Sequence, residues 1–242
     1  MLPGLTPNIG AIGAPAYHIP YSGDFSAGDD VRRTFNVEGN RKKFTISLWL
    51  ELDAVGSNRC IIETAGGTGT HEFRVNSSNR IQLTKRGTGT NCDYTSTATL
   101  TLSTWYHVVL SVDTTQALSA NRVKIFVDGT EGAAENTAVS QNVDLAINDN
   151  TQHRIGERTG GAEDFEGRMA EFIFVNDQQL DAANFGRTAG GVWVPKEYKG
   201  SYGTTGFLLQ FADSGNLGDD TSGNGNDFTN YGVSQSTDTP TS

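Results

Sequence analysis

The sequence predicts an all-β protein that folds as a two-sheet antiparallel sandwich. From Tyr21 onward, segments of alternating apolar and polar residues follow one another along the chain, and a period of two is typical of a strand with one buried face. The 29 glycines, with many Thr, Ser and Asn residues, suit tight turns between such strands. About a dozen strands with almost no helix are expected, and that many short strands pack as two sheets.

The chain is expected to divide into an extended N-terminal arm, residues 1–19, and one β-sandwich domain, residues 20–242. Frequent prolines and glycines in the arm exclude a regular helix and a central strand. Its small apolar residues, such as Leu5 and Ile9, show no amphipathic repeat. Two interpretations remain open, a floppy terminus or a segment that docks on a neighbouring subunit.

The strands in the first half of the domain are marked by alternation. Phe44–Leu52 alternates apolar residues with Thr45, Ser47, Trp49 and Glu51. Two segments, HEFRVN and RIQLTK, flank Ser77-Ser78, which is a hairpin signal. Two more segments alternate in the same way, and the second ends in Asp-Gly, a strong turn signal: Trp105–Asp113 and Arg122–Gly129.

The last third of the chain adds two strands and one helical turn. Gly167–Asn176 is predicted as a long strand. Leu180–Gly186 is predicted to make one or two helical turns, with Asp181 near the start and Gly186 as the stop. Phe207–Phe211 is a continuous apolar run, which predicts a strand in the centre of a sheet and buried on both faces.

Charge and composition limit the classes of partner. The 242 residues carry a net charge of −10 with a pI near 4.8, and such a surface repels phosphate backbones, so nucleic acid is not expected as a partner. No apolar run approaches the roughly 20 residues of a membrane helix, and the N-terminal residues lack a signal-peptide pattern. No membrane partner is therefore expected. Cys60 and Cys92 are predicted to be free thiols, with a single bridge as the alternative.

Five segments, in order along the chain, resemble those of the laminin-G-like, concanavalin A-like jelly-roll superfamily. They are YSGDFSAGDDVRRTF at 21–35, FTISLWLEL at 44–52, WYHVVLSVD with VKIFVDG at 105–129, FEGRMAEFIFVNDQQLD at 165–181 and DDTSGNGNDF at 219–228. The resemblance implies a jelly-roll sandwich whose first and last strands pair, so that the chain ends lie close together. Glu171 matches the second member of the family's Asp-Glu pair, and Ala170 replaces the first.

A narrower resemblance is to laminin-G-like domains of tailed-phage virion proteins, including tail fibres. It is carried by the order of residues 165–186, 191–207 and 220–228 and by the terminal TDTPT. It implies location on the virion, as a capsid decoration protein or a tail or fibre component, after synthesis in the host cytoplasm. Other virion proteins are expected as partners through the arm, and a homo-oligomer, taken as a trimer, is expected.

No catalytic residue is predicted, and the protein is expected not to be an enzyme. Some glycanases of this superfold carry Glu-x-Asp-x-x-Glu on one strand, where alternation places the carboxylates on one face. Glu51 and Asp53 begin this motif, but Gly56 stands in place of the second Glu. The four histidines lack metal-ligand spacing, and no Ser lies in a nucleophile elbow.

A candidate calcium site lies in the loop before the C-terminus. Asp220, Ser222, Asn224 and Gly225 form D-x-S-x-N-G, which resembles the first half of a calcium loop, whose alternate side-chain oxygens converge on one cation. Tyr231 replaces the acidic residue of the twelfth position. The alternative is that these residues only form side-chain-to-backbone turns. The candidate ligands are Asp220, Ser222, Asn224, Asn226 and Asp227, and calcium is the one candidate cofactor.

Two functions are predicted. The first is a non-enzymatic structural protein of a phage particle. The second is a carbohydrate-binding adhesion module that recognises glycans on the host surface. For this module, Trp193 and Tyr198 are the candidates for stacking on a sugar, because they lie in a segment rich in Gly and Pro. Packing in the sandwich or at its rim is the alternative for each tryptophan.

Overall fold

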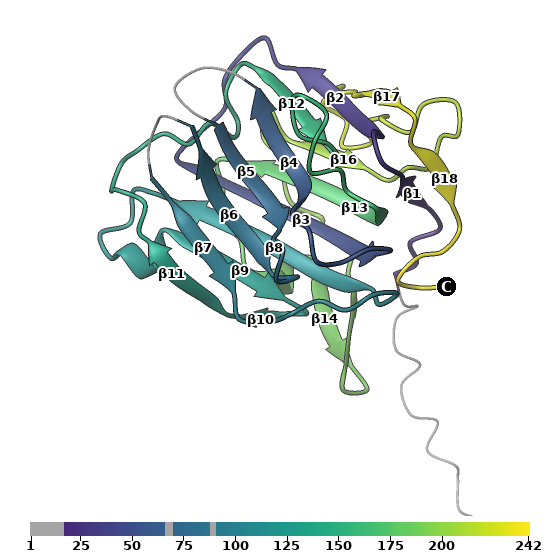
Figure 1. The fold of residues 1–242 in the computed structure, drawn as a ribbon, viewed down its shortest axis with the longest axis horizontal. Helices are drawn as coiled ribbons and strands as arrows, with labels where there is room; N and C mark the ends of the chain where they lie inside the picture. The colour runs from purple at the N-terminus through teal and green to yellow at the C-terminus, as the bar shows by residue number, and fades with distance from the viewer. Residues whose placement is uncertain (1–16, 66–69, 88–90) are drawn as a thin grey trace, which may run out of the picture.

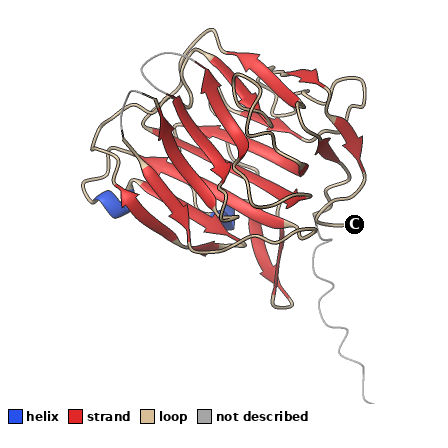
Figure 2. Ribbon diagram, viewed as in Figure 1, coloured by secondary structure: helices blue, strands red, loops and turns tan. Residues whose placement is uncertain are grey.

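The computed structural model describes residues 17–65, 70–87 and 91–242. Two antiparallel sheets of eight strands each face one another (Figures 1 and 2). The predicted all-β jelly-roll sandwich is therefore confirmed. The front sheet of Figure 1 has the order β11 (Ala133–Thr137), β7 (Asp93–Ser96), β6 (Ile81–Arg86), β5 (Thr70–Val75), β4 (Arg59–Ala65), β12 (Gln152–Ile155), β2 (Asp30–Thr34) and β17 (Thr229–Tyr231).

The rear sheet lies behind the front sheet in Figure 1. Its order is β10 (Thr130–Glu131), β9 (Val123–Val127), β8 (Tyr106–Asp113), β3 (Lys43–Leu52), β13 (Gly167–Asn176), β1 (Ser22–Phe25) and β18 (Ser234–Ser236), and β16 (Phe207–Leu209) pairs with β13. The described residues also form two short 3₁₀ turns, η1 (Ser119–Asn121) and η2 (Ala182–Asn184), and a separate hairpin of β14 (Gly186–Ala189) and β15 (Val192–Pro195).

Strand alternation builds the core between the sheets. On β3, Phe44, Ile46, Leu48 and Leu50 are fully buried in the main hydrophobic cluster. The intervening residues of β3 point to the other face, as the sequence predicts, and Trp49 packs there with Ile19 and Ala170. Burial of these large apolar side chains is the main driving force for the sandwich.

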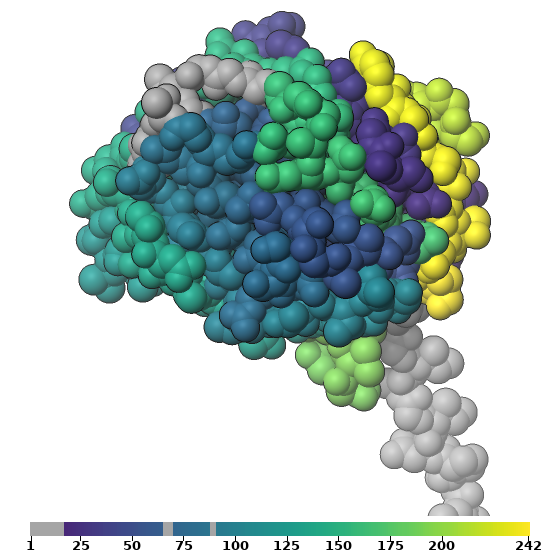
Figure 3. All heavy atoms as spheres, in the orientation of Figure 1, coloured from purple at the N-terminus to yellow at the C-terminus, as the bar shows by residue number. Residues whose placement is uncertain are grey.

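The outer face of the rear sheet is covered by a second layer, formed by residues 17–19, η2, the β14–β15 hairpin and the segment that follows it. The outward side chains of β8, β9 and β13 pack there against Phe185 and Tyr198. Gly190 and Gly191 have φ of 57° and 84° and form the hairpin turn. The tip of the hairpin protrudes from the sandwich at the bottom of Figures 1 and 3.

The predicted turn forms, and the last predicted strand is shorter than expected. η2 is a single 3₁₀ turn, and Asp181 caps it by accepting a hydrogen bond from the Ala183 N–H. Gly186 begins β14 instead of stopping a helix. β16 is buried on both faces as predicted, but among the described strands it pairs with β13 alone, so it does not lie in the centre of a sheet. It ends at Leu209, and Phe211 has φ 54°, which is incompatible with a continuing strand.

The chain ends meet at one edge of the sandwich. β1 pairs with β18, with Ser22 opposite Ser236, which confirms the expected pairing of the first and last strands. Within the predicted arm, residues 1–16 lie outside the described residues. Residues 17–19 lie on the rear sheet, with Ile19 only 1% exposed. Cys60 and Cys92 are both buried and free.

Candidate functional site

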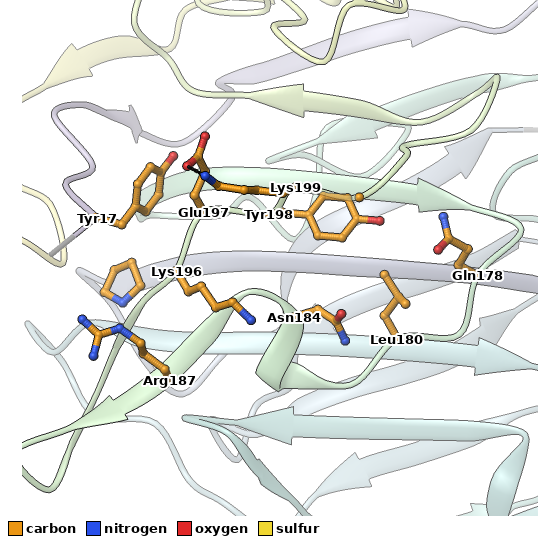
Figure 4. Close-up of a pocket in the computed structure, with 11 residues that line it drawn as sticks. Tyr17, Gln178, Leu180, Asn184, Arg187, Lys196, Glu197, Tyr198 and Lys199 are labelled. Carbon is orange, nitrogen blue, oxygen red and sulfur yellow. Dashed lines mark ion pairs between the residues drawn. The ribbon is translucent and has the colours of Figure 1, made fainter. Parts of the chain in front are cut away.

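A cleft of about 660 Å³ lies over the outer face of the rear sheet (Figure 4). It is bounded by Tyr17, by the turn after β13 together with η2, by β14, and by residues 195–200. This volume falls within the range of sites for small ligands. The polar side chains that line it are Gln178, Asn184, Arg187, Lys196, Glu197 and Lys199.

Tyr198, a predicted sugar-stacking residue, lies in the wall of this cleft. Its ring packs against Phe185 at 5.0 Å and Tyr202 at 5.2 Å between ring centroids. Its hydroxyl donates to the Ser201 carbonyl at 3.0 Å. Since only 9% of the residue is exposed, Tyr198 supports the cleft and offers a small part of its surface to a ligand.

Trp193, the other predicted stacking residue, is not part of the cleft lining. Its indole packs against the backbone of Gly129 and Gly186, where an added Cβ would come within 2.4 and 2.5 Å of the ring. The indole also stacks on His107, with 5.9 Å between centroids and 28° between planes. The structure therefore places Trp193 beneath the hairpin and separates it from Tyr198. Sugar stacking by either residue stays a prediction.

A buried Ser–His pair lies between the hairpin and the rear sheet. The Trp193 Nε1–H donates to His107 Nδ1 at 3.1 Å, and His107 Nε2 lies 2.9 Å from Ser47 Oγ. Because Nδ1 accepts a hydrogen bond, Nε2 carries the hydrogen of the neutral ring and donates to Ser47. Burial lowers the pKa of His107 to about 3. The imidazole is thus arranged to hold the hairpin, not to take a proton from Ser47.

Glu171 and Tyr17 meet just below the cleft. A bulge interrupts the pairing of β13 with β3 between Ala170 and Ile173, and Glu171 there has φ 49°. The Glu171 carboxyl accepts from the Tyr17 hydroxyl at 2.7 Å and from Gln210 Nε2 at 2.9 Å. Burial raises the pKa of this carboxyl. The pair attaches the start of the described chain to the rear sheet.

Asp220, the first predicted calcium ligand, organises its loop by hydrogen bonds. Its Oδ1 accepts from the N–H groups of Leu208 and Ser222, each at 2.9 Å, and its Oδ2 accepts from the N–H of Asn226 at 2.8 Å. Asp227 in turn accepts from the N–H of Asp220 at 3.0 Å. These contacts are side-chain-to-backbone turns of the kind that the sequence left as the alternative.

The amides of Asn224 and Asn226 also point to backbone. The Asn224 side chain donates to the Gly203 and Gly206 carbonyls at 2.7 and 2.9 Å, and the Asn226 side chain donates to the Thr204 and Gly206 carbonyls at 3.1 and 2.9 Å. In the described part of the chain, no three carboxylate, imidazole or thiol groups converge in a way that could hold a metal ion. Hydrogen bonds account for the loop, and calcium binding stays a prediction.

The half-motif of Glu51 and Asp53 forms an ion-pair cluster. Arg168 lies 2.8 Å from Glu51 Oε2 and 3.4 Å from Asp53 Oδ1. Burial raises the pKa of the Glu51 carboxyl, and the hydrogen bond from Arg168 opposes this shift. Both carboxylates are therefore engaged by one arginine.

The front sheet carries a buried charged network on its outer face. Glu63 and Glu72 stand opposite each other on β4 and β5. Arg74 pairs with Glu72 at 3.3 Å and with Glu163 at 3.2 Å. Burial, and after it the neighbouring Glu163 carboxyl, raise the pKa of Glu72 to about 8, although Arg74 opposes this shift. The segment after β12, green in Figure 3, lies over the strands here and brings Glu163 to them.

The comparison with protein families agrees with this architecture. The profile of the laminin-G type within the concanavalin A-like lectin/glucanases superfamily matches residues 26–183, which is more than half of the chain. The protein belongs to this superfamily. A search of curated proteins found no match. The described part of the chain contains no helix with the length and apolarity needed to cross a membrane.

Among the solved structures that are similar in fold are two with TM-scores above 0.5. A heptameric SAP-like pentraxin from Limulus polyphemus has a TM-score of 0.51 and 15% identity, over 68% of this chain and 80% of that chain. A putative carbohydrate-binding protein from Bacteroides ovatus has a TM-score of 0.56 and 16% identity, over 90% of this chain and 60% of that chain. At these identities the similarity establishes the fold alone.

Proposed function

We propose that this protein is a carbohydrate-binding domain and that the cleft over the rear sheet holds its glycan. The cleft carries the proposal, because it combines a suitable volume with several polar groups beside two tyrosines. Amide, ammonium, guanidinium and carboxylate groups can together donate to and accept from sugar hydroxyls. The similarity in fold to a putative carbohydrate-binding protein supports the same function.

The cleft is also pre-formed. Lys196 N–H donates to the Phe185 carbonyl at 2.9 Å, and the Gln178 side chain donates to the Ser201 carbonyl at 2.8 Å. Asn184 is fixed by its bonds to Asp181 at 2.9 and 3.1 Å. Because these walls are already held in place, binding a sugar would cost little ordering of the protein.

A glycan array followed by NMR mapping tests this function. The array should give at least one ligand, and titration with it should shift the backbone amides of residues 178–184 and 196–200. Amides of the front sheet, such as those of β6, serve as the internal control and should not move. A blank array, or shifts confined to the front sheet, would contradict the proposal. Running the array in calcium and in EDTA also tests the predicted role of calcium.

The structural role on a phage particle stays a separate prediction. It rests on the sequence resemblance. The expected contacts with other virion proteins are through the arm, residues 1–19, of which residues 1–16 lie outside the described residues. A glycan-binding domain can also be a virion component, so the two roles are compatible. We further propose that the protein is non-enzymatic, a trimer and located on the virion. A particle reconstruction that lacks symmetric copies of this chain would overturn the virion role.

A further inference from the structure

The cleft has a charge opposite to that of the whole protein. Acidic residues outnumber Lys and Arg by 28 to 18 along the chain. The cleft lining instead contains three cations, Arg187, Lys196 and Lys199, against one carboxylate, Glu197. Such a reversal of charge in a concave site favours a ligand of negative charge.

Two of these cations have no carboxylate partner among the residues that the structure describes. Lys199 pairs with Glu197 at 3.2 Å. Lys196 Nζ donates to the Ala183 carbonyl at 2.7 Å and forms no ion pair in the described part of the chain. The Arg187 side chain forms neither a hydrogen bond nor an ion pair with any described residue. Protein carboxylates therefore leave Arg187 and Lys196 available to a ligand.

Among the twelve arginines, only the side chain of Arg187 has no polar partner in the described part of the chain. Arg33, Arg80 and Arg122 donate to carbonyl or hydroxyl oxygens. Eight arginines of the described chain form ion pairs with Asp or Glu, namely Arg32, Arg41, Arg59, Arg74, Arg86, Arg154, Arg158 and Arg168. In a chain with excess carboxylates, a cation that folding leaves unpaired is the group best suited to bind an external anion. The planar guanidinium in particular matches a carboxylate by two parallel hydrogen bonds.

Both cations lie on the β14–β15 hairpin or directly after it. Arg187 lies on β14 opposite Val194 of β15, and Lys196 directly follows β15. Figure 4 shows their side chains on the side of the cleft that the hairpin and η2 form, across from Tyr17 and Glu197. The hairpin is itself fixed to the rear sheet by the bond from Trp193 to His107. In Figure 4 the Arg187 guanidinium points away from the Lys196 ammonium, which lies near Asn184. Arg187 is thus the group positioned for an anion, and Lys196 adds positive charge to the same side of the cleft.

We propose that the ligand of this cleft is an acidic saccharide, a sugar whose carboxylate binds Arg187. The sugar hydroxyls then face Asn184, Gln178 and the tyrosine side of the cleft. This inference rests on the proposed carbohydrate-binding function and specifies the substrate class of the same site. The acidic surface elsewhere keeps polyanions from binding outside the cleft.

The test compares a short uronic-acid oligosaccharide with its carboxyl-reduced, neutral form, which has the same linkages. Calorimetric titration is carried out at 0.15 M salt, where the Debye length of about 8 Å screens the distant acidic surface. The acidic form should bind, and the neutral form should bind at least about tenfold more weakly, as expected for loss of hydrogen bonds to charged groups.

Arg187→Gln should weaken binding of the acidic form by about tenfold or more and leave binding of the neutral form unchanged. Arg80→Gln is the matched control, because Arg80 is also exposed and forms no ion pair in the described chain, but lies on the front sheet side. Unfolding midpoints should be equal for both variants. Equal binding of the two saccharide forms would overturn the acidic-ligand inference and leave the carbohydrate-binding proposal standing. Absence of any glycan binding would overturn both.

Discussion

Trp193 shows how one side chain can fix a whole surface feature. Its indole N–H donates to a histidine nitrogen that is shielded from solvent, since His107 is only 1% exposed. Gly129 and Gly186 leave room for the ring, because any Cβ there would collide with it. A buried acceptor that loses its donor costs more than the bond itself contributes. Trp193 is therefore a structural anchor of the hairpin.

The substitution Trp193→Phe should lower the free energy of unfolding by about 1–3 kcal/mol, because it removes the donor to buried His107. Urea denaturation followed by fluorescence measures this change. Trp105→Phe is the control, since it removes an indole that donates to the exposed carboxylate of Asp238 at 3.1 Å, and its cost should be within about 0.5 kcal/mol. Equal losses in the two variants would show that the buried bond is unimportant.

Single residues could be predicted only in part. Alternation correctly placed Ser47 and Trp49 on the outward face of their strand. The contact between His107 and Trp193 joins positions 86 residues apart, and no local pattern indicates such a pair. For the same reason Trp193 was predicted to stack on a sugar, because the sequence does not show that its ring packs against Gly129 and Gly186. Arg187 and Lys196 could not be predicted as ligand-binding residues, because the sequence does not show which charged side chains form ion pairs and which do not.

At the scale of elements, charged side chains fasten one loop to the front sheet. The Thr159 N–H donates to Glu63 at 2.7 Å, and Glu163 pairs with Arg74 and Arg158. Glu72 lies at the centre of these groups and is fully buried. With a pKa near 8, Glu72 carries a proton at neutral pH and can donate to Glu163. Ionisation of Glu72 would place its carboxylate beside that of Glu163, and the two negative charges would repel each other.

The stability of this element should fall as the pH rises from 6 to 8. The folded pKa of Glu72 is raised to about 8 from its ordinary value of 4.5. Its stabilising contribution is therefore complete below pH 4.5 and is lost as the pH rises through 8, by up to about 1.4 kcal/mol per pH unit. Glu72→Gln stays neutral, so its free energy of unfolding should lack this decline in urea titrations.

The control for the Glu72 prediction is Glu131→Gln, at an exposed position of β10. This variant should follow the wild-type pH dependence, because the carboxylate that it removes is exposed and pairs with Lys124 at the surface. The depressed pKa values of His107 and His153 affect all three proteins equally and cancel in the comparison. Parallel curves for the wild type and Glu72→Gln would refute the proposed protonation of Glu72.

The loop of Asp220 yields a prediction about calcium. Asp220→Asn keeps one carbonyl oxygen but turns an NH₂ group toward backbone donors, so it should cost about 1–3 kcal/mol of unfolding free energy in EDTA. Asp219→Asn is the control, because the Asp219 side chain accepts no hydrogen bond in the described chain and should change little. If calcium binds, adding it should raise the melting temperature of the wild type and not of Asp220→Asn.

Strands with alternating apolar and polar residues could be predicted well. The layer that covers the outer face of the rear sheet could not. β3, β8 and β13 lie where their patterns placed them, because each has one face in the core. The β14–β15 hairpin was missed, although Gly190-Gly191 is a turn signal, because its strands are short and half exposed. The cleft depends on this hairpin, so its location required the structure.

At the scale of the whole molecule, the two chain ends stabilise one another. Beyond the pairing of β1 with β18, Thr241 Oγ1 accepts from the Ile19 N–H at 3.1 Å and donates to the Ile19 carbonyl at 2.9 Å. The first-with-last pairing could be predicted from the jelly-roll resemblance, since closure of this fold brings the ends together. The packing of residues 17–19 on the rear sheet could not be predicted, because the prolines on both sides of them, Pro15 and Pro20, indicate that these residues belong to the arm.

Two truncated chains test where the domain begins. Deletion of residues 2–16 and deletion of residues 2–19 differ only in Tyr17, His18 and Ile19. The longer deletion should be less stable by at least about 2 kcal/mol, because it exposes the surface that buried Ile19 covers and removes the hydroxyl that donates to Glu171. Urea denaturation of both chains measures the difference. Equal stability would place the boundary after residue 19, as the sequence predicts, whereas the expected loss would place it before Tyr17.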